Sequence, residues 1–500
     1  MENKVRVRFA PSPTGYLHVG GLRTALYNYF FAKKNGGTFI LRIEDTDQKR
    51  FVPGTIESLV TSLNETGLIP DEGVFLENGV VIQKGDHGPY IQSERLDIYK
   101  KYADELVANG KAYHCFCTAE RLTQVREEQA HNKQAPKYDK HCLALTSSEV
   151  TKKLAAGAPH VLRLNILSDR GDVMFDDMVR GQVKINVRDI DDQVLMKSDG
   201  FPTYHLANVV DDHLMEITHV IRAEEWVSST PKHILLYEAF AWEMPQFAHI
   251  PLLLNPDKSK LSKRQGDVAV EDYLKKGYLQ EALVNFVALL GWNPGQGSTQ
   301  EIFSLNELVS AFDLAAVHKS GAVFDLKKLD WMNAEYIKRL SVDALYEKIL
   351  TDGFLKKPII ANAPETMRSE EYMKKVLTIE QERLAKLSDV SENNSFFFAS
   401  ELSYDAALLN WKENSKDMTK AALEKAQTII SDLNDADFAR REILEKILLE
   451  AAGERRGDFL WPLRVALTGA QKSPSPFDCA WVLGNTESLK RIKNAISSLS

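Results

Sequence analysis

Cysteine is scarce in this sequence, with four residues among 500. A chain of this length with so few cysteines is not built on a disulfide framework. The sequence also lacks an uninterrupted apolar run close to the roughly 20 residues that a membrane-spanning helix needs. The first residues, Met1 to Lys4, lead directly into a predicted strand and leave no room for a signal peptide. We therefore expect a cytoplasmic protein with no membrane partner.

Two familiar phosphate-binding motifs are missing as well. The sequence has no Gly-x4-Gly-Lys-Ser/Thr, and no Gly-x-Gly-x-x-Gly follows a predicted strand. Any nucleotide chemistry must therefore use another device. The net charge of −8 argues mildly against a nucleic-acid partner but does not exclude one, because recognition depends on where the basic residues cluster.

What remains is the composition of an ordinary globular protein with several domains. Charged residues make up 26% of the chain and hydrophobic residues 44%. Five hundred residues exceed the roughly 250–300 that one hydrophobic core supports.

The stretch from Arg8 to Gly21 predicts a strand, a tight turn and the start of a helix. The N-terminus of such a helix offers backbone N–H groups and a positive dipole end, which suit a phosphate. Gly20 and Gly21 allow close backbone approach, and His18 can donate to a developing negative charge. The alternative is a buried turn with a satisfied core histidine.

A second polar cluster ends the predicted strand over 39–47, which closes with Arg42, Glu44, Asp45 and Asp47. Ligands of open α/β sheets bind at the carboxyl ends of strands, so these side chains are candidates for a binding site. The alternative is a solvated turn whose aspartates cap a helix.

Two later segments extend this pattern. Tyr204, Asn208 and Asp211 share one face of a predicted helix that is otherwise apolar, which favours a site over a purely structural role. The predicted strand over 218–226 delivers Arg222, whose planar guanidinium suits a carboxylate. The alternative for Arg222 is an internal salt bridge to Glu44 or a nearby aspartate.

The segment 250–266 runs from an apolar strand into a loop rich in glycine, proline and lysine. Its basic residues are Lys258, Lys260, Lys263 and Arg264. Lysines on a mobile loop can neutralise a triphosphate as pyrophosphate leaves. The alternative is a solvated loop. Beyond residue 270 apolar residues recur at helical spacing, as at Ile443 and Ile447, which predicts stacked helices.

The stretch 8–21 resembles the first signature of the class I aminoacyl-tRNA synthetases, and Ala10 to Gly15 resembles its glutamyl/glutaminyl branch. Residues 260–264 resemble the second signature, with Leu for the common Met and Arg for the final Ser. The signature's usual second histidine is Gly21 here, so the resemblance places more of the catalytic load on His18 and the lysines. The two signatures occur in order, and the match to the bacterial-type glutamyl branch extends over essentially the whole chain.

The resemblance implies an α/β fold: a Rossmann-like parallel-sheet catalytic domain with an α+β insert, followed by all-α C-terminal domains. The expected ranges are 1–110 (first catalytic half), 111–192 (acceptor-binding insert), 193–255 (second half), 256–335 (signature loop and tRNA stem contacts) and 336–500 (anticodon-binding region).

The resemblance also implies residue roles. Glutamate binding falls to Arg8, Ala10, Ser12, Glu44, Tyr204, Asn208 and Arg222. ATP binding falls to His18, Gly20, Gly21, Glu225, Trp226 and Lys263. Catalysis falls to His18, Lys260 and Lys263, and Arg464 is a candidate tRNA contact, although a structural ion pair explains it almost as well.

Three cysteines lie close together in the sequence, at Cys115, Cys117 and Cys142. With an oxygen or imidazole as fourth ligand they can bind zinc tetrahedrally. Relatives with a Tyr-x3-Cys half-site make Tyr138 the candidate, and His114, His131 and His141 are substitutes. The alternative is a set of reduced, metal-free cysteines.

The implied activity is ATP-dependent ligation of L-glutamate to the 3′ end of tRNA(Glu) through a glutamyl-adenylate, with Mg²⁺ and a monomeric enzyme. Charging of tRNA(Gln) as well stays open. A glutaminyl enzyme usually carries β-barrel anticodon domains, and a short relative that modifies a tRNA base lacks the C-terminal region. A non-catalytic tRNA-binding protein would be expected to lose His18, Glu44 or Lys263, and all three are present.

Overall fold

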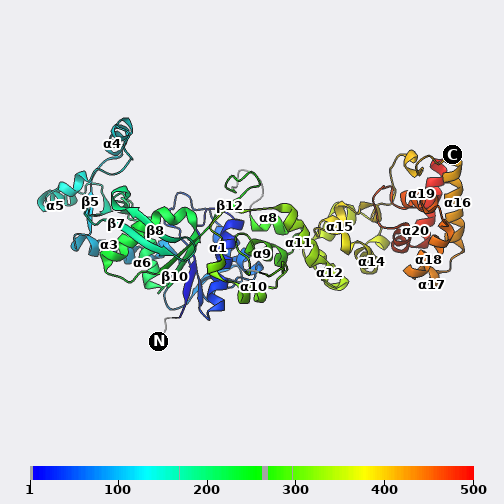
Figure 1. Cartoon of the computed structure of the whole chain (residues 1–500), viewed down its shortest axis with the longest axis horizontal. Coiled ribbons are helices and arrows are strands. Elements are labelled where there is room, and N and C mark those ends of the chain that lie inside the picture. The colour runs from blue at the N-terminus through cyan, green and yellow to red at the C-terminus, as the bar shows by residue number, and fades with distance from the viewer. Residues whose placement is uncertain (1–3, 168, 262–268, 296, 500) are drawn as a thin grey trace. The chain divides into compact units, whose positions relative to one another are not determined.

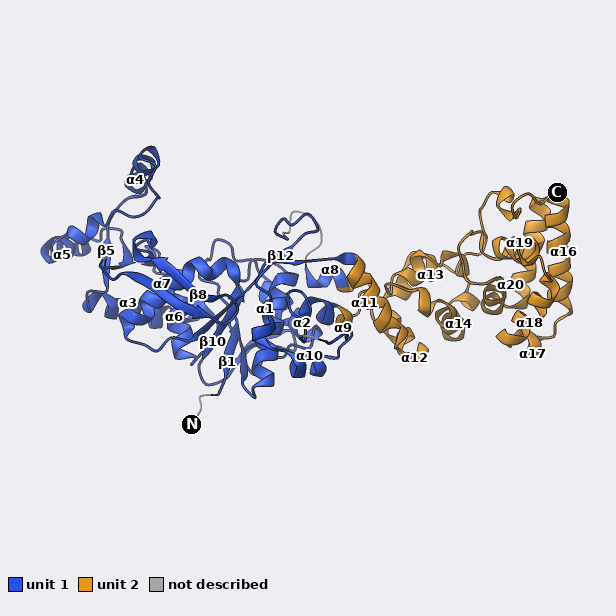
Figure 2. Ribbon diagram, viewed as in Figure 1, with its two compact units in different colours: residues 1–273, 283–326 blue, residues 274–282, 327–500 orange. Residues whose placement is uncertain are grey.

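The computed structural model describes residues 4–167, 169–261, 269–295 and 297–499. The chain divides into two compact units (Figure 2). Unit 1 comprises residues 1–273 and 283–326, and unit 2 comprises residues 274–282 and 327–500. No helix of the described residues is long and apolar enough to cross a membrane.

Unit 1 is organised around two four-stranded sheets (Figure 1). The first has the order β1 (Arg6–Phe9), β2 (Thr38–Leu41), β3 (Glu72–Glu77) and β4 (Val80–Lys84). The second has the order β10 (His219–Ala223), β11 (Gln246–Ile250), β7 (Asp172–Asp177) and β8 (Gly181–Asn186). In each sheet the first three strands are parallel and the last is antiparallel.

The two sheets meet edge to edge at β1 and β10. The Thr218 N–H donates to Arg6 O at 2.9 Å, and the Arg6 N–H donates to Thr218 Oγ1 at the same distance. The carboxyl ends of β1 and β10 therefore lie side by side, and the strand order runs outward from them in both directions. Such a switch point is where open α/β folds bind ligands.

Helices pack against these strands and position their ends. They are α1 (Val19–Lys34), α2 (Thr55–Glu65), α3 (Leu96–Ala108), α6 (Tyr204–Leu214) and α7 (Thr230–Phe240). Helix α1 packs against β1, β2 and β10. Its Asn28 Nδ2 donates to Ile221 O at 3.0 Å, which ties α1 to β10 across the switch point.

A third sheet carries the cysteine-rich segment. It consists of β5 (Ala112–Cys115), β6 (Val161–Leu164) and β9 (Val194–Met196). Helices α4 (Ala119–His131) and α5 (Ser147–Ala155) lie in this part of the chain and have no buried residues. Strands β7 and β8 fall within the range 111–192 but join the catalytic sheet beside β11, whereas β9 lies outside that range and pairs with β6.

The rest of unit 1 continues the chain from the catalytic sheet. Its elements are β12 (Leu253–Leu254), α8 (Val270–Lys275), α9 (Gln280–Ala288), α10 (Leu305–Ala311) and β13 (Ala322–Val323), with parts of α8 and α9 belonging to unit 2.

Unit 2 consists of helices joined by loops, with no strand among its described residues. Its helices are α11 (Leu326–Lys338), α12 (Val342–Thr351), α13 (Pro358–Ala361), α14 (Glu370–Glu380), α15 (Asp389–Glu392), α16 (Lys416–Asp432), α17 (Asp435–Phe438), α18 (Arg441–Ala452), α19 (Arg456–Thr468) and α20 (Pro476–Ser498). They share one hydrophobic core. In α18 the fully buried residues are Leu444 and Leu448, one position after Ile443 and Ile447, which are half-buried.

The polar face of α6 divides between the pocket and the core. Tyr204 and Asn208 line the pocket described below, whereas Asp211 is fully buried against α3. The Asp211 carboxylate accepts hydrogen bonds from Arg95 Nε (2.8 Å), Gln92 Nε2 (2.9 Å) and the Tyr99 hydroxyl (2.8 Å). Asp211 thus fastens α6 to α3 and is not among the residues that line the pocket.

We predict that Asp211→Ala lowers the free energy of unfolding of unit 1 by about 3–5 kcal/mol, because the substitution leaves the Arg95 cation buried without its partner. Asp104→Ala is the matched control, since it removes an exposed ion pair with Lys100 on α3; such a pair contributes only about 0.3–0.5 kcal/mol. Urea denaturation measures both. Equal effects would contradict the assignment of Asp211 as the tie between these helices.

Candidate active site

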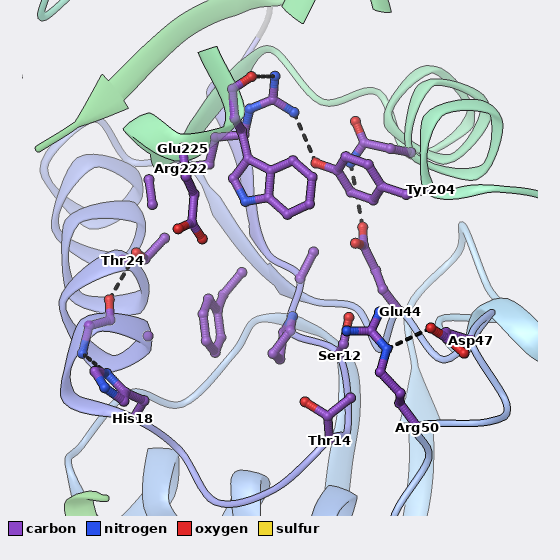
Figure 3. Close-up of a pocket in the computed structure, with 18 of the residues that line it drawn as sticks. Ser12, Thr14, His18, Thr24, Glu44, Asp47, Arg50, Tyr204, Arg222 and Glu225 are labelled. Atoms are coloured by element: carbon purple, nitrogen blue, oxygen red, sulfur yellow. Dashed lines mark hydrogen bonds and ion pairs between the residues drawn. The ribbon is translucent and has the colours of Figure 1, made fainter. Parts of the chain in front are cut away.

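A cavity of about 840 Å³ opens at the carboxyl ends of β1 and β10 (Figure 3). Its walls come from the β1–α1 turn, the segment after β2, the start of α6 and the end of β10. Most residues expected from the sequence line it: Arg8, Ala10, Ser12, His18, Gly20, Gly21, Glu44, Tyr204, Asn208, Arg222, Glu225, Trp226 and Lys260. Lys263 lies outside the described residues.

His18 occupies the N-cap position of α1. Its Nδ1 accepts a hydrogen bond from the Gly20 N–H at 2.9 Å. A neutral imidazole that accepts at Nδ1 carries its proton on Nε2, so His18 can donate from that nitrogen. A side chain at Gly20 would place its Cβ 3.2 Å from His18 Nδ1, and one at Gly21 would place its Cβ 3.1 Å from Leu17 Cδ1. The two glycines therefore keep the cap tight and the helix end accessible to an anion.

Buried charges of both signs lie at and behind one wall of the pocket, where Arg8 and Glu44 line it. Arg8 donates to both carboxylate oxygens of Asp212, at 3.0 and 3.2 Å. Arg42 bridges Asp212, at 2.8 Å, and Glu44, at 3.0 Å. Burial raises the pKa of Asp212, but Arg8 and Arg42 outweigh it and hold that pKa below its usual value. Two cations and two carboxylates thus balance within this group.

Glu44 is the carboxylate of this group that reaches the cavity. Its Oε1 accepts from Arg42 and, at 3.4 Å, from Asn208 Nδ2. Burial raises the pKa of Glu44, and the attraction of Arg42 and Arg8 offsets only part of that rise. A carboxylate at a buried wall is suited to an ammonium group, whose positive charge stabilises its ionised form.

Arg222 differs from Arg8 and Arg50, which also line the pocket but each pair with a carboxylate. It is 5% exposed, and within the described part of the chain it forms no ion pair. Its guanidinium donates to neutral acceptors: His249 Nε2 (3.0 Å), the Tyr204 hydroxyl (3.0 Å), His233 Nδ1 (3.3 Å), Thr230 Oγ1 (2.9 Å) and Trp226 O (3.4 Å). The internal salt bridge to Glu44 is not formed, since Glu44 pairs with Arg42.

The histidines around Arg222 are neutral. Burial lowers the pKa of His233 well below its usual value, and the Arg222 charge lowers it further. Burial, with Lys232 and Arg222, lowers the pKa of His205 to about 3. The positive charge of Arg222 is therefore not shared with these rings, and a carboxylate that enters the pocket meets a buried cation.

Lys260 and Glu225 also line the cavity. Their side chains form an ion pair, and both are about half exposed. An exposed pair of this kind contributes about 0–1 kcal/mol, so a triphosphate can readily take Lys260 from Glu225. Figure 3 shows Glu225 on the same side of the pocket as His18 and Thr24 of α1, with Glu44, Asp47 and Arg50 across the cavity.

Several residues at this site were not singled out from the sequence as binding residues. Arg42 was expected only as part of the polar cluster that ends the strand over 39–47, and Asp212 and His249 were missed. Asp212 has a weak signal, as the second of two adjacent acids in an apolar helix. His249 has none, because only the pairing of β10 with β11 sets it opposite Arg222. Asp45 lies behind the pocket, where its Oδ1 accepts a hydrogen bond from the Ser93 N–H at 2.8 Å.

The cysteine-rich segment brings its expected ligands together. The Sγ atoms of Cys115, Cys117 and Cys142 lie within 4.8 Å of one another. The Tyr138 hydroxyl lies 3.3 Å from Cys115 Sγ and 3.4 Å from Cys117 Sγ, and Cys117 Sγ lies 3.5 Å from Cys142 Sγ. Arg464 lies in α19 of unit 2, where its side chain is half-buried.

Comparison with known proteins agrees with this geometry. Residues 4–331 match the catalytic domain of tRNA synthetases class I (E and Q), and residues 346–496 match an anticodon binding domain. The chain is 47% identical to a glutamate–tRNA ligase of Chloroherpeton thalassium, covering 100% of this chain and 99% of the relative. It is also 47% identical to a glutamate–tRNA ligase of Clostridioides difficile, covering 98% of each.

A solved structure extends the match to the fold. The crystal structure of a glutamate tRNA ligase from Elizabethkingia meningosepticum, in complex with its amino acid, superimposes with a TM-score of 0.87 at 38% identity. The match covers 100% of both chains. On these findings the chain belongs to the class I tRNA synthetases, within the glutamate–tRNA ligase family.

Proposed function

We propose that this chain joins L-glutamate to the 3′ end of tRNA(Glu) in two steps, with glutamyl-adenylate as the intermediate. The observation that carries the proposal is Arg222, a buried cation at the pocket wall whose described partners are all neutral. Glu44 lines the same pocket, so a positive and a negative group face a molecule bound between Arg222 and Glu44. Glutamate has the complementary pair, a side-chain carboxylate and an α-ammonium group.

Glutamate takes the part of the pocket between these two groups. Arg222 and the Tyr204 hydroxyl hold the side-chain carboxylate, and the entering carboxylate replaces one of the neutral acceptors of Arg222. Glu44, which Asn208 contacts, holds the α-ammonium group. The remaining wall is formed by Arg8, Ala10 and Ser12.

ATP enters as its Mg²⁺ complex, since phosphate oxygens are the ligands that Mg²⁺ prefers. It lies along the N-terminus of α1, against Gly20, Gly21 and His18, with its adenosine beside Glu225 and Trp226. The supporting observations are that all five line the cavity and that His18 Nδ1 accepts from the Gly20 N–H, which places the proton of a neutral ring on Nε2. Lys260 lies at the same end, and we assign Lys263 a triphosphate contact from the sequence alone.

In the first step a glutamate α-carboxylate oxygen attacks the α-phosphorus of ATP. The bond to the bridging oxygen breaks, and pyrophosphate leaves with the electron pair. No enzyme nucleophile takes part. His18 donates a hydrogen bond to the phosphate oxygens as charge develops, and the lysines neutralise the leaving pyrophosphate. The contribution of the pocket is positioning and electrostatic stabilisation.

In the second step a hydroxyl of the 3′-terminal adenosine of tRNA attacks the carbonyl carbon of the adenylate, and AMP leaves. Unit 2 reads the anticodon, with Arg464 as one contact, and the segment with α4 and α5 approaches the acceptor end. The exposed faces of α4 and α5 and the family match of residues 346–496 support this division. We infer a monomeric enzyme that requires tRNA before it activates glutamate and acts in the cytoplasm.

Zinc fits the cysteine-rich segment. Four ligands at about 2.0–2.3 Å from a zinc ion in a tetrahedron lie about 3.5–3.8 Å from one another. The sulfur and hydroxyl separations of 3.3–3.5 Å come close to this arrangement. Backbone N–H groups donate to Cys142 Sγ and the Tyr138 hydroxyl, which holds both atoms in place. A zinc ion held by these four residues would be structural.

Arg222→Ala should lower kcat/KM for glutamate by about 100-fold or more, because the substrate carboxylate loses a buried charged partner. The KM for ATP should stay unchanged. Charging of tRNA(Glu) with radiolabelled glutamate measures this, and glutamine in place of glutamate should give no product with the unmodified chain. Arg170→Ala, which removes an exposed arginine paired with Glu238, is the control. A variant as active as its parent would contradict the assignment.

The purified chain should contain one zinc ion, and Cys142→Ser should lose it. Cys479→Ser is the matched control, because Cys479 is a buried cysteine of unit 2 that lies outside this cluster. Elemental analysis after dialysis gives the stoichiometry. Equal zinc contents in the two variants, or none in the unmodified chain, would show that the cluster is not a zinc site.

A further inference from the structure

The acceptor of Arg222 Nε is itself held by a buried carboxylate. His249 Nδ1 lies 2.5 Å from Asp177 Oδ2, while His249 Nε2 accepts from Arg222 Nε at 3.0 Å. Asp177 is 3% exposed and His249 is fully buried. The three residues come from β7, β11 and β10, which are adjacent parallel strands. Asp177, His249 and Arg222 therefore form a line across the sheet that ends at the pocket.

The proton positions along this line follow from the charges. Burial raises the pKa of Asp177, but hydrogen bonds from the His249 ring and from backbone N–H groups outweigh it and lower the pKa below its usual value. Burial lowers the pKa of His249, and Arg222 opposes a second positive charge. An ionised Asp177 takes its hydrogen bond from Nδ1–H, which leaves the Nε2 lone pair facing Arg222.

We propose that Asp177 and His249 are positioning residues for glutamate recognition: the carboxylate fixes the tautomer of His249, and His249 holds the Arg222 guanidinium where it meets the substrate carboxylate. The inference rests on the proposed role of Arg222. It adds that specificity depends on a residue that does not line the pocket, at the end of β7. Asp177 also supplies the buried negative charge that offsets Arg222 without occupying its carboxylate-binding side.

An asparagine at position 177 would reverse the direction of the hydrogen bond between residue 177 and His249. Asp177 Oδ1 accepts from the backbone N–H groups of Val179, at 3.0 Å, and Arg180, at 2.9 Å. Those donors require the amide oxygen of an asparagine to take the Oδ1 place, so its amide nitrogen faces His249 Nδ1. The imidazole then carries its proton on Nε2 and points a donor at the Arg222 Nε–H.

The first test is Asp177→Asn in tRNA charging. We expect the KM for glutamate to rise about 10- to 100-fold, the range for a hydrogen bond to a charged group. The values of KM for ATP and tRNA, and kcat at saturating glutamate, should change by less than about threefold. Asp172→Asn is the matched control, because Asp172 lies on the same strand and forms an exposed pair with Lys184. A glutamate KM equal to that of the control would overturn the proposal.

The second test separates positioning from mere structure. A glutamine at position 249 offers Arg222 an amide oxygen that does not depend on a carboxylate partner. Asp177→Asn combined with His249→Gln should therefore bring the glutamate KM back to within about threefold of the unmodified chain. Additive losses in the double variant would overturn the proposal.

If Asp177→Asn does not fold, His249→Gln and His249→Leu decide the matter with Asp177 intact. The glutamine variant should keep its glutamate KM and the leucine variant should lose at least about 10-fold; equal values would contradict the inference. Arg222→Ala separates a failure of the proposed function from a failure of the positioning role. An unchanged glutamate KM in Arg222→Ala defeats the proposed function, whereas a raised KM there with an unaffected Asp177→Asn defeats only the positioning role.

Discussion

A buried guanidinium without a carboxylate partner is the constraint on which the pocket depends. Removing a cation from water is costly. The fold offsets this cost at Arg222 with hydrogen bonds to neutral acceptors and with the Asp177 carboxylate, which lies on the far side of the His249 ring. Had Asp177 paired directly with Arg222, no charge would remain for a substrate. The parallel pairing of β10, β11 and β7 prevents this, since it places His249 between Arg222 and Asp177.

The balanced charges on the other wall serve the same end. Arg8 and Arg42 hold Asp212, and Arg42 also holds Glu44, so the acids of this wall already have cations. Glu44 keeps a place at the cavity because Arg42 and Asn208 contact the same oxygen. The pocket thus has a positive and a negative end that do not neutralise each other, and an amino acid with a second carboxylate matches both.

The sequence predicts much of this arrangement where function is local. The β1–α1 turn with His18, the strand that delivers Arg222 and the helix that carries Tyr204 were all expected, because strand–turn–helix patterns and apolar periodicity place them. Such patterns do not predict which residues of different strands and helices pair with one another. The polar face of α6 gave no sign that Asp211 faces α3, and nothing in the sequence sets His249 beside Arg222. Where apolar residues are adjacent, as in α18, periodicity also leaves the buried positions uncertain by one residue.

The most direct measurement is a crystal structure with a non-hydrolysable analogue of glutamyl-adenylate. We expect the side-chain carboxylate to lie within hydrogen-bond distance of the Arg222 guanidinium and the Tyr204 hydroxyl, with the α-ammonium group at Glu44. We also expect His249 to stay between Arg222 and Asp177. A side-chain carboxylate bound away from Arg222, or an Arg222 that has turned to pair with an acid of the protein, would contradict the central claim.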